Sequence, residues 1–171
     1  MNLDLINLKS LGKRVSYPKN FQLVRMEEQC EVFWILEKGI ARYIYQEGER
    51  ELTGWFDMEG DIVGSVYSLL GFGGAREKIQ LVEDSDLIEI QLSDLLQDDV
   101  FYQSFKMNVL SHYFIEMESR LKFFQALDGK GRYLHILENK PQLLQRVPLN
   151  LIASFLGLTP ESLSRIRNSI S

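Results

Sequence analysis

The stretch VFWILEKGIARYIYQEGERELTGWF, residues 32–56, decides the fold of the chain. Three apolar and aromatic runs follow one another within it, at residues 33–36, 40–45 and 52–56. Two polar turns that contain a glycine separate them, at residues 37–39 and 46–49. Short aromatic and β-branched runs between turns of this kind predict antiparallel strands. This part of the chain is therefore expected to be a β domain.

The strand pattern extends on both sides of this stretch, over residues 15–90. The segment IQLVEDSDLIEI, residues 79–90, supplies another pair of strands around a polar turn at 83–85. Several short strands at this spacing predict a barrel or jelly roll. We therefore predict an α+β protein whose residues 1–97 form a β-roll, with a short amphipathic helix at 1–11.

The segment GDIVGSVYSLLGFGGAREK, residues 60–78, lies between predicted strands and is rich in glycine. Successive backbone N–H groups in such a segment can bind an anion. The same composition is also typical of an ordinary bend, in which Arg76 and Glu77 pair with each other. The residues alone leave both interpretations open.

Past Ser93 the apolar period becomes helical, and the carboxylates of Asp98 and Asp99 suit the start of a long helix. Apolar side chains then recur at steps of three and four residues, as in the seam of a coiled coil. The seam residues are Met107, Leu110, Phe114, Met117, Leu121 and Phe124. A second apolar stripe on a neighbouring face comprises Phe101, Phe105, Val109 and Tyr113.

Two apolar stripes on one helix have two explanations. In the first, one stripe packs on the β-roll while the other meets the same helix of a second chain. In the second, both stripes are core within a monomer. We favour the first, because a seam with this spacing is typical of paired helices, and predict a dimerisation helix over residues 98–127 and a homodimer.

The segment LNLIASFLGLTPESLSRIRNSI, residues 149–170, carries the most specific pattern in the chain. Gly157 supplies the left-handed conformation that ends a helix, Thr159 caps the next helix, and Pro160 suits its first turn. Leu163 then begins an apolar inner face. This spacing matches a helix-turn-helix, whose second helix enters the major groove of DNA.

The outward face of the second helix carries side chains that suit base edges, because arginine binds guanine with two hydrogen bonds and glutamate accepts one from cytosine. The candidate DNA-binding residues are Thr159, Glu161, Ser162, Arg165 and Asn168. The alternative is a solvated face of a three-helix packing module, with Thr159 acting as a cap. We favour DNA, and predict a helix-turn-helix domain over residues 128–171 with a hinge at its first four residues, Asp-Gly-Lys-Gly.

Charge is distributed unevenly along the chain. The total is −5, but residues 129–171 carry six basic side chains against Glu138 and Glu161, a net charge of +4. A basic segment of this kind fits binding to double-stranded DNA, whose backbone is uniformly negative.

Composition excludes several other classes of protein. No apolar run approaches the ~20 residues of a membrane span. The start of the chain, MNLDLINLKSLGKR, lacks the basic start followed by an apolar block that is typical of a signal peptide. Cys30 is the only cysteine, which excludes an internal disulfide. We expect a cytoplasmic protein without a membrane partner.

The only histidines, His112 and His135, lie on predicted helices outside the β-roll. A jelly-roll metal site needs clustered histidines and carboxylates, and neither histidine accompanies a strained nucleophile turn. We therefore expect no catalytic residue, no metal and no enzyme activity. The alternative to a DNA-binding regulator is a ligand- or partner-binding β-roll module whose helix-turn-helix is vestigial. Salt-dependent DNA binding distinguishes the two.

From about residue 15 to its end the chain resembles the Crp/Fnr family of bacterial transcription regulators. The likeness rests on WILEKGIARYIY, GDIVGS, the long helix and RVPLNLIASFLGLTPESLSRIR, the last of which resembles the branch found in Bacteroidetes-type bacteria. The resemblance implies a sensor β-roll, a dimerisation helix and a DNA-binding domain in homodimers that bind palindromic operators, with RNA polymerase as a further partner. It also implies that Glu161 and Arg165 contact bases.

In members of this family that bind cyclic nucleotides, a Gly-Glu pair and an Arg-Ser or Arg-Thr pair bound the phosphate-binding segment. The corresponding pairs here are Gly64-Ser65 and Arg76-Glu77, which are the candidate ligand-binding residues. Serine cannot supply the carboxylate that holds the ribose, and the charge of Glu77 repels a phosphate. We therefore expect no cyclic AMP binding and no cofactor, and any effector is of another kind.

Overall fold

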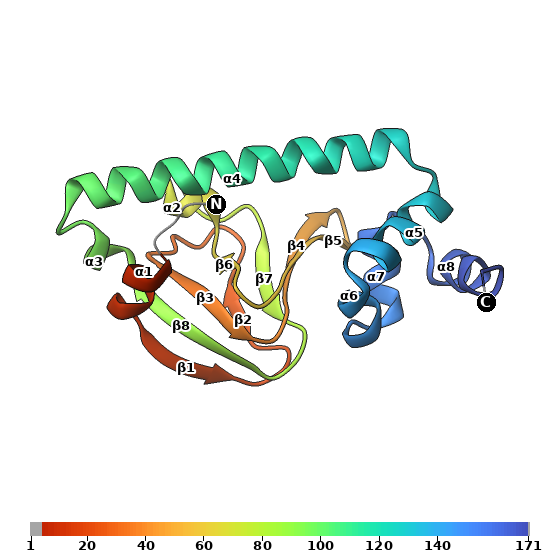
Figure 1. The fold of residues 1–171 in the computed structure, drawn as a ribbon, viewed down its shortest axis with the longest axis horizontal. Helices are drawn as coiled ribbons and strands as arrows, with labels where there is room; N and C mark the ends of the chain where they lie inside the picture. The colour runs from red at the N-terminus through yellow and green to blue at the C-terminus, as the bar shows by residue number, and fades with distance from the viewer. Residues whose placement is uncertain (1–4, 171) are drawn as a thin grey trace. The chain divides into compact units, whose positions relative to one another are not determined.

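The computed structural model describes residues 5–170 of the chain, with side chains from residue 7 onward (Figure 1). The chain divides into two compact units, residues 1–114 and 115–171. Helix α4, Asp99–Ala126, crosses this division, so its first half belongs to one unit and its second half to the other.

Within the described residues, the first unit contains short strands, three short helices and the first half of α4. The strands are β1 (Lys13–Tyr17), β2 (Gln22–Val24), β3 (Val32–Lys38), β4 (Ala41–Glu47), β5 (Arg50–Asp57), β6 (Ile62–Val63), β7 (Lys78–Leu81) and β8 (Ser85–Gln91). The short helices are α1 (Leu5–Leu11), α2 (Val66–Leu69) and α3 (Leu92–Leu95).

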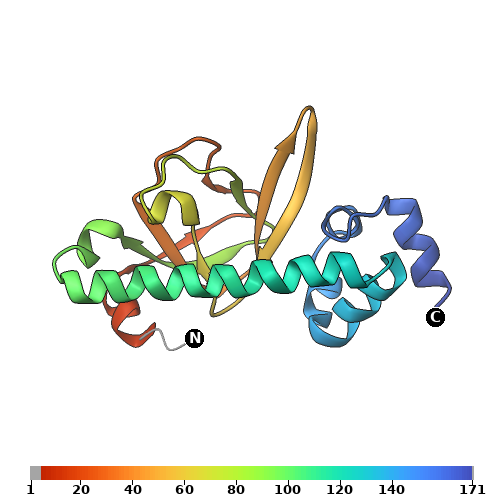
Figure 2. The same ribbon diagram turned by 90° about the horizontal axis from the view of Figure 1, so that it is seen from above.

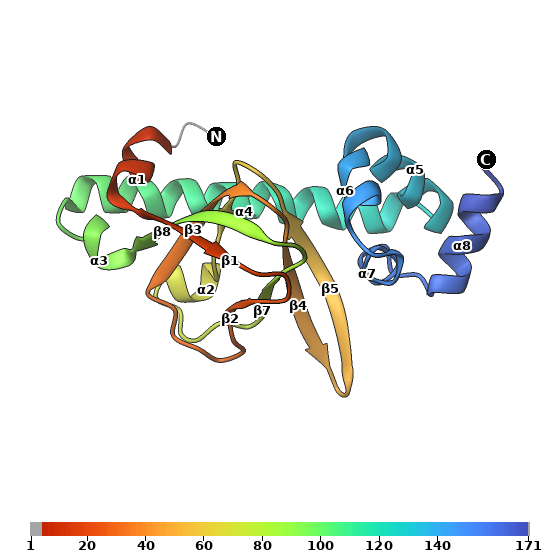
Figure 3. The ribbon, with the colours of Figure 1, turned by 90° about the horizontal axis from the view of Figure 1, so that it is seen from below.

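The strands form two four-stranded sheets, ordered β1-β8-β3-β6 and β2-β7-β4-β5. Every strand pair is antiparallel. Strands β4 and β5 make a hairpin that projects from the body of the unit (Figures 2 and 3). The structure thus confirms the antiparallel β domain that the alternation of apolar runs and turns predicts.

The predicted turns are all polar but have different roles. Residues 46–49 close the β4–β5 hairpin, whereas 37–39 and 83–85 carry the chain from one sheet to the other. The strands predicted at 79–90 therefore exist, as β7 and β8, but do not pair with each other. Gly39 has a φ of 118°, and a Cβ there would collide with the Ser85 side chain, so glycine is required where the two crossings meet.

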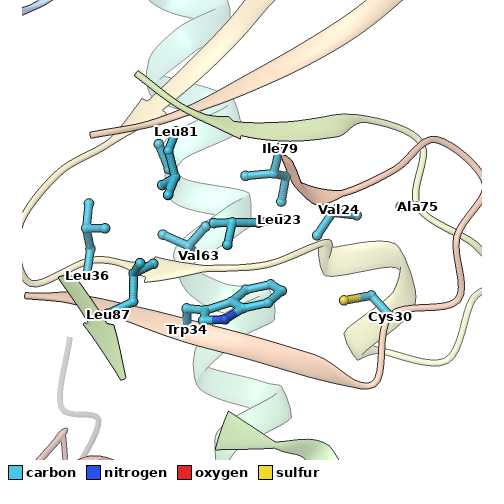
Figure 4. Close-up of a cluster of buried hydrophobic side chains, with 11 residues drawn as sticks. Leu23, Val24, Cys30, Trp34, Leu36, Val63, Ala75, Ile79, Leu81 and Leu87 are labelled. Atoms are coloured by element: carbon cyan, nitrogen blue, oxygen red, sulfur yellow. The ribbon is translucent and has the colours of Figure 1, made fainter. Parts of the chain in front are cut away.

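An apolar core fills the space between the two sheets, and Figure 4 shows its side chains pointing toward one another. Alternation places them there: in β7, Ile79 and Leu81 are buried while Gln80 between them is partly exposed. The core residues are Leu23, Val24, Cys30, Trp34, Leu36, Ala41, Val63, Ala75, Ile79, Leu81 and Leu87.

A second core lies on the opposite face of the β8–β3 pair, where helices cover the sheet. Phe33 and Ile35 of β3 contribute to it, which explains why β3 is apolar at successive positions rather than at alternate ones. From α4, Phe105 packs with Phe33 at a ring-centroid distance of 4.8 Å, and Val109 is also buried. Three residues of the second stripe, Phe101, Phe105 and Val109, therefore pack on the β domain.

Helix α1 accounts for part of the amphipathic helix predicted at residues 1–11. It spans Leu5–Leu11, and Leu8 is fully buried in the second core. Residues 1–4 of that prediction lie outside the described residues.

The second unit consists of the end of α4 followed by shorter helices. These are α5 (Gly129–Asn139), α6 (Pro141–Arg146), α7 (Leu149–Phe155) and α8 (Pro160–Asn168). Each buries apolar side chains in the unit: Tyr133, Ile136, Leu143, Ile152, Ala153, Phe155 and Leu163. The apolar spacing of the sequence thus places each helix against its neighbours.

The segment predicted as a glycine hinge is instead the capped start of α5. The Asp128 carboxylate accepts a hydrogen bond from the Gly131 N–H at 2.8 Å, and both glycines lie in the first turn of the helix. Gly129 also packs closely on Leu158, since a Cβ at this position would lie 2.7 Å from a Leu158 methyl carbon. The glycines serve helix packing, because the chain bends before them, between α4 and α5.

Candidate functional site

The turn between α7 and α8 is held by backbone hydrogen bonds that local sequence prescribes. Gly157 has a φ of +66°, and its N–H donates to the Ser154 carbonyl at 3.1 Å. The Leu158 N–H donates to the Ala153 carbonyl at 2.9 Å. This pair of bonds is the Schellman arrangement, which satisfies the carbonyls at a helix end and needs a left-handed residue. The prediction for Gly157 is confirmed.

Thr159 begins α8 as its N-cap. Its hydroxyl oxygen accepts a hydrogen bond from the Ser162 N–H at 3.2 Å, and Pro160 occupies the first turn. The Thr159 hydroxyl also lies 3.1 Å from the Ser162 hydroxyl, with which it forms a hydrogen bond. Two of the candidate DNA-binding side chains are therefore bonded to each other at the start of the helix.

Helix α8 has one buried face and one exposed face. Leu163 is fully buried and Ile166 is half-buried, which fixes the rotation of the helix on the unit. The exposed side carries three of the predicted residues, Glu161, Arg165 and Asn168. These three side chains are accessible to a partner, and four-residue and three-residue steps place them on one side of α8.

The charges on α8 follow the direction of the helix. Hydrogen bonds from its own backbone N–H and from Thr159 lower the pKa of Glu161, so this first-turn residue is ionised at neutral pH. Arg165 and Arg167 lie in the last turn, where the helix dipole favours positive charge. The exposed face thus presents an acceptor at one end and donors at the other.

Two arginines of the second unit are used in packing, which the sequence patterns did not predict. The Arg132 guanidinium lies 4.9 Å from the centroid of the Phe124 ring, and its buried Nε makes no hydrogen bond with a described residue. The Arg120 guanidinium lies 5.5 Å from the same ring and 5.8 Å from that of Phe155. Not every basic residue of this unit is therefore a free surface charge.

The predicted seam of α4 is exposed over most of its length. In the first unit, Met107 is 64% exposed and Phe114 is 68% exposed, and Leu110 is exposed as well. In the second unit, Leu121 is exposed, whereas Met117 is half-buried. Exposed apolar side chains in a row of this kind are unusual on a soluble surface unless something covers them.

Phe124 differs from the rest of the seam because it packs within its own unit. Its ring meets that of Phe123 at 5.3 Å and lies against Arg132. Conversely, Ile115 is 56% exposed beside the seam, although the heptad pattern does not select it.

In the 60–78 segment, Gly64 and Ser65 lie just before α2. The Gly64 N–H donates to the Tyr43 hydroxyl at 3.2 Å, so one of the N–H groups considered for an anion is already bonded. Ser65 occupies the N-cap position of α2, but its side chain makes no capping bond and is fully buried.

Arg76 and Glu77 point to different environments. The Arg76 guanidinium lies 4.0 Å from the centroid of the Tyr67 ring, and the residue is exposed. Glu77 is buried, and burial raises the pKa of its carboxyl group. Among the described residues the two side chains form no ion pair with each other, so the predicted pairing of Arg76 with Glu77 is wrong.

A polar network next to this segment was not predicted from the sequence. The Tyr43 hydroxyl donates to Asp57 at 2.7 Å, and the Trp55 indole N–H donates to the other carboxylate oxygen at 2.9 Å. These residues lie on β4 and β5, where Tyr43 pairs with Trp55. Only an acidic residue at the end of an otherwise aromatic run, WFD, hints at it in the sequence.

Among known proteins, the chain is similar to several solved structures. No family model matches it, and no curated protein matches it. The structure of FixK2 from Bradyrhizobium japonicum superimposes with a TM-score of 0.79, at 19% identity, over 93% of this chain and 84% of that chain. A transcriptional regulator of the CRP family from Thermus thermophilus superimposes with a TM-score of 0.71, at 17% identity, over 91% of this chain and 83% of that chain.

A CooA mutant from Carboxydothermus hydrogenoformans is also similar, with a TM-score of 0.67 and 18% identity over 99% of this chain and 84% of that chain. Identity at this level shows a shared fold. The helices of the described part are too short or too polar to cross a membrane, and residues 5–170 hold no group of three or more His, Cys, Asp or Glu that suits a metal ion.

Proposed function

We propose that this chain is a DNA-binding transcription regulator of the Crp/Fnr type that acts as a homodimer. Support comes from the fold, which it shares with FixK2 and with a CRP-family transcriptional regulator. The sequence likeness in residues 149–170 points the same way, and such a regulator would meet RNA polymerase at its promoters. The Bacteroidetes-type character of that segment belongs to the same proposal.

The single observation that carries the proposal is the presentation of α8. A capped turn fixes its start and Leu163 anchors its inner face, while Glu161, Arg165 and Asn168 stand in solvent. A helix entering the major groove needs this division, because its contacts to base edges come from one exposed face. In this proposal Arg165 binds guanine and Glu161 accepts from cytosine, with Thr159 and Ser162 near the phosphates.

The exposed seam of α4 supplies the proposed dimer interface. Met107, Leu110, Phe114 and Leu121 leave apolar surface uncovered on one helix, and the same helix of a second chain would bury it. A two-fold dimer presents two α8 helices to half-sites about one DNA turn apart, ~34 Å. Palindromic operators are the expected targets.

The β-roll is proposed as a sensor that does not bind cyclic AMP. Gly64 already donates to Tyr43, and the buried Glu77 carboxylate brings negative charge where a phosphate would have to bind. Arg76, the one arginine of the segment, is engaged with Tyr67 at the surface.

Fluorescence anisotropy with labelled duplexes tests the proposal. Purified full-length chain is titrated into a pool of randomised duplexes at several salt concentrations. The proposal predicts that log K falls linearly with log salt, with a slope that grows with the number of phosphates contacted. Absence of binding at low salt would overturn it and leave a partner-binding β-roll module as the alternative.

A further inference from the structure

Two buried polar side chains of the first unit, Ser65 and Glu77, are incompletely compensated: the Ser65 hydroxyl is an unsatisfied buried atom, and Glu77 has no basic partner among the described residues. Ser65 is fully buried, and its hydroxyl makes no hydrogen bond of acceptable geometry with any described residue. Most buried polar atoms in proteins are bonded, so an exception calls for a specific cause such as an ion or a water. Burial raises the pKa of the Glu77 carboxyl, and this rise is partly offset by the nearby Ser65 hydroxyl and by a hydrogen bond from the Arg76 backbone N–H.

Glu77 is 7% exposed, and its carboxylate has no basic partner among the described residues. None of the ion pairs among the described residues includes it. The cations on either side of it in sequence are used elsewhere: Arg76 lies on the Tyr67 ring, and the Lys78 ammonium bonds to Glu51 at 2.9 Å. An uncompensated buried charge is costly, because it loses its hydration without gaining a counter-charge.

The surroundings make this position more negative still. Burial raises the pKa of the Tyr43 phenol, and the Asp57 carboxylate that it faces raises it further, with a smaller contribution from Glu77. Both oxygens of Asp57 already accept hydrogen bonds, from Tyr43 and Trp55. Two carboxylates thus lie near the Tyr43 hydroxyl, and an anionic ligand is disfavoured there.

We propose that Ser65 and Glu77 bind a small, singly charged cation, either an alkali-metal ion or the ammonium group of a primary amine. The cation is held by a Glu77 carboxylate oxygen and the Ser65 hydroxyl oxygen. One uncompensated negative charge needs one positive charge. A divalent ion would leave a net positive charge at this buried position, which is costly in the same way as the unpaired carboxylate, and the described residues hold no group of three or more His, Cys, Asp or Glu that suits such an ion.

The site connects to the long helix through α2. Ser65 immediately precedes α2, and Glu77 immediately precedes β7, so a bound cation would join these two segments. Leu69 of α2 packs in the same buried cluster as Phe105 and Val109 of α4. A role for the cation as an effector rests on the proposed function, whereas its binding does not.

Thermal unfolding of the full-length chain without DNA tests the binding. Chloride salts of potassium, sodium and methylammonium are compared with tetramethylammonium chloride, which is too bulky, at constant ionic strength. A cation at about five times its Kd should raise the Tm by about 2–4 °C. An effect of potassium or sodium alone identifies a metal site, and an effect of methylammonium identifies an amine site.

The variants Ser65→Ala and Glu77→Gln should lose this cation-specific rise, while the matched control Glu49→Gln, at an exposed position, should keep it. A second measurement needs no variant: crystals of the wild type soaked in a thallium(I) salt should show anomalous scattering beside Ser65 and Glu77. Equal Tm values in all four salts together with no thallium peak there would overturn the proposal, and a water or a protonated Glu77 would then account for the pair. Failure to bind DNA would leave these results unaffected, so the two proposals fail separately.

Discussion

Helix α8 and the 60–78 segment carry similar residues and expose them very differently. On α8, Glu161 and Arg165 stand in solvent above a buried leucine. In the 60–78 segment, Ser65 and Glu77 are buried, and only Arg76 of the four candidates there has a charged group at the surface. An exposed charge can meet a large partner directly, whereas a buried one acts only on something small enough to reach it.

This difference in exposure predicts that variants of the α8 face and variants of Ser65 or Glu77 will change different properties of the protein. Changes on the exposed face of α8 should alter binding and leave stability intact, because surface substitutions rarely change stability by more than about 0.5 kcal/mol. Changes at the buried pair should alter stability and leave base preference intact.

The largest effect is expected at Leu163, because this residue packs α8 on the second unit and so supports both stability and the presentation of the exposed face. Leu163→Ala removes a fully buried side chain, so the free energy of unfolding of the second unit should fall by about 2–5 kcal/mol. Urea denaturation with amide exchange in α8 measures it. The control Ser164→Ala, an exposed neighbour on the same helix, should change stability little. Similar curves for both variants would mean that α8 does not pack through Leu163.

Arg165→Ala tests the exposed face alone. We expect a loss of about 1–3 kcal/mol of binding free energy at one base pair, with relaxed preference there and unchanged unfolding. Anisotropy with duplexes that differ at single positions measures both affinity and preference. Arg25→Ala removes another exposed arginine, from the first unit, and is the matched control. Unchanged base preference in Arg165→Ala would remove this residue from recognition.

Thr159→Ala tests whether the helix cap or a partner contact dominates at this position. Loss of the hydrogen bond to the Ser162 N–H should lower the free energy of unfolding by about 1 kcal/mol. Thr159→Ser keeps the oxygen and should restore stability. If Thr159→Ala weakens DNA binding without any loss of stability, the hydroxyl acts as a contact rather than as a cap.

The smallest effect is a change in pH dependence at Glu77. Burial raises the pKa of Glu77 in the folded chain, so folding is penalised once this group ionises. The penalty is absent below the ordinary pKa of 4.5, grows as pH rises from there toward the raised value, and is complete above it. Glu77→Gln should therefore gain stability relative to the wild type as pH rises, in buffers of bulky cations.

Denaturation curves of both proteins from acid to neutral pH measure this difference. A constant offset between them across that range would show that Glu77 does not change its ionisation on folding. Base preference for DNA should be the same in both proteins at every pH, because Glu77 is buried in the first unit and is not part of the exposed face of α8.

Local patterns in the sequence predicted the parts of the fold that local physics controls. Gly157 and Thr159 could be assigned because a helix end and a helix start each need one particular backbone or side-chain feature. The strands around residues 32–56 could be predicted because apolar runs alternate with polar turns there. The hinge predicted from the glycines at 129 and 131 was wrong, because glycine is tolerated both in a flexible hinge and in the first turn of a helix capped by an aspartate.

Features that depend on distant residues could not be predicted. A turn at 37–39 has the same composition whether it closes a hairpin or crosses between sheets, and the pairing of β3 with β8 decides which. The Tyr43–Asp57 bond joins two strands, and the burial of Glu77 depends on residues brought together only by the fold. Likewise, no spacing rule shows that Arg132 packs on Phe124.

Selection of DNA sites from random duplexes tests most directly whether the chain is a homodimeric DNA-binding regulator. The number of chains bound to each selected site is then measured. The proposed regulator predicts a palindrome with half-sites about one helical turn apart, bound by two chains. The double variant Met117→Glu with Leu121→Glu should sediment as a monomer and lose this palindrome, whereas Gln125→Glu, exposed on the same helix, should keep it. Recovery of no sequence, or of an asymmetric site bound by one chain, would contradict the claim.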